Sequence, residues 1–158
     1  MRTRCAPLVI VAGVLLASTA PLAHAACVAL ASGRGGAPLA LVALDARGSV
    51  FRIHYIHSVT RTPVEERYVV EGDRIVQTEI RFEQHGPGLP TAPDEGGTFE
   101  QRDGTFIVRG RRTFDRIVMR VEPAQRPALT TAAQTLDLAR WGRGALALTA
   151  SAADCDAP

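Results

Sequence analysis

The sequence contains no lysine, and its 18 basic residues, all arginine, are nearly balanced by 16 acidic residues. The arginines form no long basic block and no stripe that alternates with aromatic residues. A protein that binds nucleic acid needs such a positive surface to neutralise phosphate groups. The composition therefore argues against a nucleic-acid partner, and the short cluster of Arg109, Arg111 and Arg112 is interpreted as a solvated strand edge or turn.

Common catalytic motifs are also absent. The chain has no G-x-S-x-G elbow, no H-E-x-x-H motif, no phosphate-binding P-loop and no C-x-x-C pair, and Gly86-Pro87-Gly88 is too short for a dinucleotide fingerprint. His57 and Ser58 are adjacent, so on a strand they point to opposite faces and cannot easily act as base and nucleophile. We therefore expect a protein without catalysis, without a hydrolase site and without a cofactor.

The first 25 residues have the three regions of a secretory signal. Arg2 and Arg4 precede an apolar run over residues 7–17, and small residues lead to Ala25. The apolar run is too short for a membrane-spanning helix. We expect cleavage after Ala25 and a periplasmic or secreted protein. Lipidation of Cys27, which follows two alanines, and a retained signal anchor are the alternatives.

Cleavage would leave a single domain over residues 26–158, with sixteen basic and sixteen acidic residues and no long linker or repeat. This domain keeps Cys27 near its start and Cys155 near its end. In an oxidising compartment two such cysteines are expected to pair, which ties the two ends of the domain together. Closing so long a loop would stabilise the fold by roughly 3–5 kcal/mol in the chain-entropy model.

Short runs of alternating apolar residues, separated by glycine and proline turns, predict an all-β fold. The predicted strands cover residues 28–32, 39–44, 51–59, 64–70, 75–82, 105–109, 116–121, 129–131, 135–138 and 145–149. Strands 105–109 and 116–121 are expected to pair across an arginine-rich turn, residues 139–141 to form a helical turn, and residues 132–140 alternatively a short helix. Glycine and proline crowd residues 83–104, which are predicted to be one long loop. About eight to ten short strands are typical of a single antiparallel β-sandwich or closed barrel.

The central predicted hairpin, residues 51–70, contains the most unusual residues. If Thr60 and Pro63 close its loop, the antiparallel register places His57 opposite Glu66 and Tyr55 opposite Tyr68. Opposed side chains lie roughly 4.5–5.5 Å apart at Cβ. The hairpin is therefore expected to place an imidazole against a carboxylate on an otherwise apolar face.

Three motifs in and after this hairpin resemble a known family. They are His57-Ser58-Val59, Thr62-Pro63-Val64-Glu65-Glu66 with Tyr68, and Gly86-Pro87-Gly88-Leu89-Pro90. From about Cys27 to Thr149 the chain is similar to the bacterial "domain of unknown function 1850" family, with Pro87 where a small residue is expected. The resemblance implies a small exported protein, often encoded beside tripartite ATP-independent periplasmic (TRAP) transporters of the TAXI type, and it implies no established reaction. Pro87 would stiffen the loop, which argues against a role that requires this turn to move.

The expected His57–Glu66 pair has three interpretations. In the first, the pair is structural and fixes the hairpin register, because a buried carboxylate is costly without a partner. In the second, the pair is part of a ligand or partner site, over which the long loop folds at that end of the hairpin. In the third, the pair binds a metal ion, with His85 as the third ligand beside His57 and Glu66. The residues expected at a ligand or partner site are His57, Ser58, Arg61, Glu66, Tyr68, Gly86 and Gly88.

Together these observations predict a non-catalytic, exported accessory or binding protein. The resemblance implies that its partner is a subunit of a TAXI-type TRAP solute transporter, and the polar residues suit a small-molecule solute. The alternative is a stand-alone envelope protein that binds a small ligand or a metal ion at the corner of His57 and Glu66. Arg61, at the tip of the turn, suits an anionic ligand or a partner protein.

Overall fold

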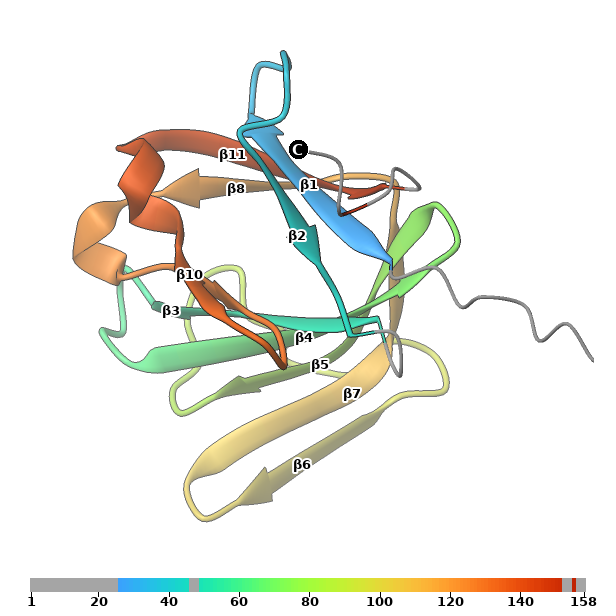
Figure 1. Cartoon of the computed structure of the whole chain (residues 1–158). Helices are drawn as coiled ribbons and strands as arrows, with labels where there is room; N and C mark the ends of the chain where they lie inside the picture. The colour runs from blue at the N-terminus through green and yellow to red at the C-terminus, as the bar shows by residue number, and fades with distance from the viewer. Residues whose placement is uncertain (1–25, 46–48, 152–154, 156–158) are drawn as a thin grey trace, which may run out of the picture.

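The computed structural model describes residues 26–45, 49–151 and 155, and these form two antiparallel sheets packed face to face (Figure 1). The predicted signal sequence, residues 1–25, lies outside the described residues. The small sheet has the strand order β2-β1-β11-β8, and the large sheet has the order β10-β9-β3-β4-β5-β7-β6. The all-β prediction is confirmed, and of its two forms the sandwich is right, since the sheets do not close into a barrel.

The strands are short, as the alternating runs predicted. The small sheet contains β1 (Cys27–Ser32), β2 (Ala40–Ala43), β8 (Ile117–Val121) and β11 (Gly144–Ser151). The large sheet contains β3 (Val50–Ile56), β4 (Pro63–Glu71), β5 (Arg74–Phe82), β6 (Thr98–Arg102), β7 (Thr105–Phe114), β9 (Ala128–Thr130) and β10 (Thr135–Asp137). Two 3₁₀ helices, η1 (Pro123–Gln125) and η2 (Leu138–Trp141), complete the described elements. Within the described part of the chain no helix is long and apolar enough to cross a membrane.

Two hydrophobic clusters lie in this fold. The main core fills the space between the sheets with inward-facing side chains such as Leu30 and Leu148 from the small sheet and Phe51 from the large one, none of them accessible to solvent. The second cluster contains Val64, Ile80, Phe82, Leu89 and Val108. Side chains two apart on a strand share a face, so Val64 on β4 faces the same side as Tyr68 of the main core. The loop residue Leu89 therefore covers a part of the large sheet that the small sheet does not.

Two predictions about the middle of the chain are wrong. The predicted loop over residues 83–104 contains β6, an edge strand that pairs with β7. Strand β7 continues through residues 110–114 instead of turning, and β8 pairs with β11 in the other sheet rather than with β7. The turn near Asp115 thus carries the chain from the large sheet to the small one, at the side of the sandwich where Figure 1 shows β7 rising to β8.

The arginine cluster therefore lies on a strand rather than in a turn. Arg109 pairs with Glu79 at 2.7 Å and with Glu100 at 2.5 Å, and Arg111 pairs with Glu71 at 2.7 Å. Acidic side chains on neighbouring strands thus balance the charges of Arg109 and Arg111, although the pairing of β5 with β7 is irregular between Arg109 and Arg112.

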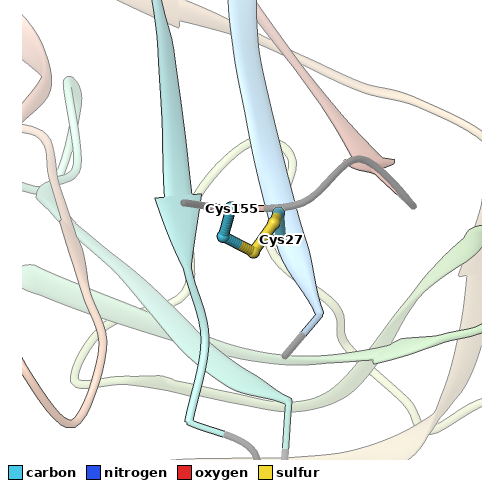
Figure 2. Close-up of a disulfide and its surroundings, with 2 residues drawn as sticks. All are labelled: Cys27 and Cys155. Carbon is cyan, nitrogen blue, oxygen red and sulfur yellow. A yellow bond between two sulfur atoms is a disulfide. The ribbon is translucent and has the colours of Figure 1, made fainter. Parts of the chain in front are cut away.

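The predicted disulfide is confirmed. Cys27 is buried at the start of β1, and Figure 2 shows it bonded to Cys155, in the segment that follows β11. The two Cα atoms are 5.9 Å apart, and the bond joins residues separated by 128 positions. The bond ties the start of β1 to the segment that follows β11, and these two strands are already neighbours in the small sheet.

Candidate functional site

The central hairpin forms, but with a different register from the predicted one. Ile53, not His57, lies opposite Glu66, and Tyr55 lies opposite Val64. His57 is four residues beyond Ile53, which corresponds to roughly 13 Å along a strand. The predicted pairing of His57 with Glu66 is therefore wrong, and the two residues belong to separate polar clusters.

The reason lies in the turn, which spans residues 57–62 instead of closing at Thr60 and Pro63. The backbone N–H of His57 donates to the carbonyl of Thr62 at 2.9 Å, and the N–H of Arg61 donates to the carbonyl of His57 at 3.0 Å. Arg61 has a left-handed backbone with φ of 60°, which completes this wider loop.

The first polar cluster, which we term the His57 corner, consists of His57, Thr60, Gly86 and Pro87. The Nδ1 atom of His57 accepts hydrogen bonds from the backbone N–H groups of Val59 and Thr60, at 3.3 and 3.2 Å. Because Nδ1 is the acceptor, Nε2 carries the proton and donates it to the carbonyl of Pro87 at 3.1 Å. The ring is 6% exposed, and backbone groups satisfy both of its nitrogens.

Gly86 is required at this corner by close packing. A Cβ atom at Gly86 would lie 2.7 Å from Cε1 of His57 and 2.9 Å from Cγ2 of Thr60. Gly88 has a positive φ of 87°, which turns the loop so that Leu89 reaches the second hydrophobic cluster. The corner therefore joins the hairpin turn to the long loop, and no ring atom is left to bind a ligand.

The other predicted site residues of the turn do not meet Glu66 either. Ser58 and Arg61 are exposed at the tip of the turn, on either side of the exposed Val59. His85 packs against the rings of Phe106, at 4.3 Å between centroids, and of Phe99. Among the described residues no group of three or more histidines, cysteines, aspartates or glutamates could hold a metal ion, so the metal site of His57, Glu66 and His85 is not assembled.

The second polar cluster, which we term the Glu66 cluster, consists of Tyr55, Glu66, Tyr68 and Gln77. The hydroxyl group of Tyr55 donates to Oε1 of Glu66 at 3.1 Å, and the hydroxyl group of Tyr68 donates to Oε2. The side-chain amide of Gln77 donates to the Tyr68 hydroxyl oxygen at 3.3 Å. The Tyr68 ring stacks on Phe51 of the main core, with 5.0 Å between centroids, so core packing holds this tyrosine in position.

Burial dominates the electrostatics of this cluster. It raises the pKa of Glu66, and hydrogen bonds from Tyr68 and Tyr55 and the charge of Arg112 offset only part of that effect. Burial, followed by the nearby charge of Glu66, also raises the pKa of both tyrosines. The two hydroxyl groups therefore remain protonated and act as hydrogen-bond donors to the carboxylate.

The Glu66 cluster faces a cleft of about 360 Å³ between the two sheets. The inner face of the large sheet forms one wall, and β8 with the connection to β9 forms the other. The lining residues are Ile53, Tyr55, Glu66, Tyr68, Gln77, Arg112, Phe114, Ile117, Val118, Met119, Arg120, Gln125 and Pro127. A cleft of this volume lies at the lower end of the range for small-molecule sites.

Of the residues that line this cleft, the sequence analysis named Glu66 and Tyr68 as site residues, at the expected corner with His57, and did not name Tyr55, Gln77 or Arg112. In a regular strand Gln77 would face away from Ile80 and Phe82, because side chains an odd number of positions apart point to opposite faces. The register of β5 shifts between Gln77 and Glu79, and such a β-bulge places an extra residue in one strand and changes which side chains face inward. The inward position of Tyr55 could have been predicted, because it alternates in step with Phe51 and Ile53 and so faces the same side of the strand.

The matched family model covers the part of the chain that builds both polar clusters. It is described as "Domain of unknown function (DUF1850)" and matches residues 51–138, which is more than half of the chain. No curated protein and no solved structure matches the sequence. The matched range starts in β3, spans the central hairpin and the long loop, and ends in η2. The chain belongs to the DUF1850 family.

Proposed function

We propose that the protein is a non-catalytic binding protein whose small organic ligand occupies the cleft between the sheets. The observation that carries the proposal is the carboxylate of Glu66, which two tyrosine hydroxyl groups hold against this cleft. Small-molecule sites combine mostly apolar walls with a few convergent polar groups and perturbed titratable residues. The Glu66 cluster, the apolar side chains of β8 and the raised pKa of Glu66 have this combination.

The residues that line the cleft favour binding over catalysis. None of the described lining residues is a serine, threonine, cysteine, lysine or histidine, so Glu66 is the one described lining residue with a carboxyl group that could act as a base or nucleophile. The two tyrosines donate to Glu66 and have raised pKa values, so neither supplies a phenolate nucleophile at neutral pH. Glu66 itself is held in place at both oxygens, as a fixed recognition group would be.

We further propose that the protein is exported and serves a TAXI-type TRAP transporter as an accessory that binds the transported solute. A disulfide between distant cysteines is typical of an oxidising compartment, and the N-terminal 25 residues have the pattern of a secretory signal. The transporter association is an implication of the family resemblance. The stand-alone envelope protein would use the same cleft, because the corner of His57 and Glu66 is not assembled.

Two exposed valines provide a matched test of the cleft. Val118 lines it and is 56% exposed, whereas Val59 lies at the turn tip and is 65% exposed. A panel of amino acids, dicarboxylates, sugars and amines is screened for a rise in melting temperature, since a ligand that binds only the folded protein stabilises it. We expect at least one compound to stabilise the wild type and Val59→Trp but not Val118→Trp. Equal melting temperatures with and without every compound would overturn the binding proposal.

The transporter association has its own experiment. The tagged protein is recovered from the envelope of cells that express it natively, in the presence of the stabilising compound. Recovery of a TRAP permease or solute-binding subunit is the expected result, and Val118→Trp tests whether it depends on a filled cleft. Ligand binding without any TRAP subunit would instead identify a stand-alone binding protein.

A further inference from the structure

The hydrogen-bond pattern of the Glu66 cluster determines which atoms are left for a ligand. Both tyrosine hydroxyl hydrogens are used on Glu66, and the side-chain nitrogen of Gln77 donates to Tyr68. A carboxylate has about four lone-pair positions, so each oxygen of Glu66 can accept one more hydrogen bond. The Tyr55 hydroxyl oxygen and the Gln77 carbonyl oxygen are further acceptors. The cluster thus offers acceptors to the cleft and has most of its donors occupied.

The charge of Glu66 points to the same kind of ligand. No ion pair of the described residues includes Glu66, whereas Glu79 is paired with Arg81 at 2.6 Å and with Arg109 at 2.7 Å. Arg112 acts on Glu66 through its charge but makes no ion pair with it, so this partly buried carboxylate is still costly, and a cation bound directly to it would recover part of that cost. The Tyr55 ring lines the same cleft, and aromatic faces also attract cations. An ammonium group meets all of these requirements.

A positive charge lies at the rim of the cleft. Arg120 belongs to the edge strand β8, where its exposed side chain alternates with the inward-facing Ile117 and Met119, so it borders the cleft from the open edge of the small sheet. It makes no ion pair within the part of the chain that the structure describes. Arg112 lines it from β7, where its guanidinium is 3.6 Å from Asp94 and lies over the Phe114 ring. Arg120 is therefore the arginine that is free to pair with an anionic group of a ligand. Ile53, Phe114 and Met119 supply the apolar surface between the charges.

We infer that the ligand is a small zwitterion of the amino-acid type, with its ammonium group on Glu66 and its carboxylate on Arg120. This inference rests on the proposed binding function and names its ligand class. The acceptor-rich Glu66 cluster selects the ammonium group, because a carboxylate placed there would meet acceptors and a like charge, whereas a sugar hydroxyl could donate one hydrogen bond but would leave the charge of Glu66 unpaired. The unpaired Arg120 selects the carboxylate, and the apolar wall holds the carbon chain.

The test uses three sets of related probes that differ by one charged group. Leucine is compared with isoamylamine and 4-methylpentanoate, phenylalanine with phenethylamine and 3-phenylpropionate, and 5-aminopentanoate with pentylamine and pentanoate. Binding is measured by calorimetry on the intact protein. We expect a zwitterion to bind at least about tenfold more tightly than both of its relatives, since each charge-assisted contact contributes that order of affinity. Comparison of the three zwitterions separates α-amino acids from ω-amino acids.

Two substitutions assign the ends of the ligand. Glu66→Gln should weaken the zwitterion about tenfold and leave the carboxylate relative unchanged, and Arg120→Gln should weaken the zwitterion and leave the amine relative unchanged. The matched controls are Glu65→Gln, which alters the neighbour that pairs with Arg52 at 3.7 Å, and Arg102→Gln on β6; both should bind as the wild type does. Equal binding of zwitterion and carboxylate, or an unaffected Glu66→Gln, would overturn the inference. If a sugar or dicarboxylate from the wider panel then binds in the cleft, the proposed function stands and only its ligand class is wrong.

Discussion

The His57 corner and the Glu66 cluster stand on one hairpin, yet they differ in where their hydrogen-bond partners come from. Backbone groups of the turn and of the long loop satisfy both nitrogens of His57. Side chains satisfy Glu66, one hydroxyl group for each oxygen. A group bonded by backbone holds segments of chain together, whereas a carboxylate held by side chains keeps lone pairs for a ligand. The comparison separates a structural motif from the proposed recognition site.

The two regions also differ in what covers them. The long loop closes over His57 so tightly that Gly86 has no space for a Cβ atom. The Glu66 cluster faces a cleft whose opposite wall includes the exposed Val118. Substitutions in the corner should therefore reduce stability and leave ligand binding unchanged. Substitutions in the cluster should weaken ligand binding and change stability only a little.

The largest effect on stability is expected from His57→Ala. It removes a buried ring and leaves two N–H groups and one carbonyl without their partner, at a cost of about 3 kcal/mol in the free energy of unfolding. His54→Ala, on the preceding strand, is the control and should cost less than about 1 kcal/mol. Urea denaturation measures both. A loss of ligand affinity by folded His57→Ala with unchanged stability would reverse the assignment of the two regions.

A smaller loss is expected from Gly86→Ala. The new methyl group would overlap Cε1 of His57, and separating the loop from the turn should cost about 2 kcal/mol. Gly144→Ala is the matched control, because a Cβ atom there meets nothing within 4 Å, and it should change stability by less than about 0.5 kcal/mol. Equal denaturation midpoints for the two variants would show that the corner is not closely packed.

Glu66→Gln should stay within about 1 kcal/mol of the wild type at neutral pH, since an amide fills the same space. Its informative effect is on pH dependence. The raised pKa means that folded Glu66 holds its proton more strongly than unfolded Glu66 does. The contribution of Glu66 to stability is thus complete below the unfolded pKa and is lost as the pH rises through the folded pKa. Denaturation midpoints from pH 4 to pH 8 should therefore favour Glu66→Gln increasingly over the wild type, and a difference that shrinks toward pH 8 would contradict a raised pKa.

The smallest effect is expected from Tyr55→Phe. It removes one hydrogen bond to Glu66 and should cost about 0.5–1 kcal/mol. Because this hydrogen bond lowers the pKa of Glu66, the pKa should rise further in the variant. NMR titration of the Glu66 side-chain carboxyl carbon measures the change directly. An unchanged titration would mean that the Tyr55 hydroxyl group does not contribute to holding the carboxylate.

The sequence predicted which faces of the hairpin are buried, but not its register. Inward parity is visible in the alternation of Phe51, Ile53 and Tyr55, because side chains of a strand alternate between faces. Register depends on where the turn closes, and that depends on His57 accepting two local N–H groups and on the left-handed backbone of Arg61. Neither is visible as a pattern of residue types. For this reason Glu66 was predicted to face His57, whereas Ile53 lies opposite it.

The remaining differences have similar causes. Strand β6 is short, mostly polar and at the edge of its sheet, so it lacks the apolar alternation that identifies strands. Gln77 and Arg112 reach the cleft through a β-bulge, which shifts the alternation without a sequence signal of its own. Long-range pairing, such as that of β8 with β11, follows from the packing of two sheets and is not a local property.

The disulfide of Figure 2 has a mechanical consequence. All strands of the two sheets lie between Cys27 and Cys155, so the bond turns the sandwich into a covalent ring. Tension applied to the chain on both sides of this ring passes across the two sulfur atoms and does not shear β1 from β11. An enzyme that unfolds proteins by pulling one end of the chain through a pore would have to admit two linked chain segments side by side. Resistance to stretching therefore depends on one covalent bond, and its reduction would expose the sheets to force.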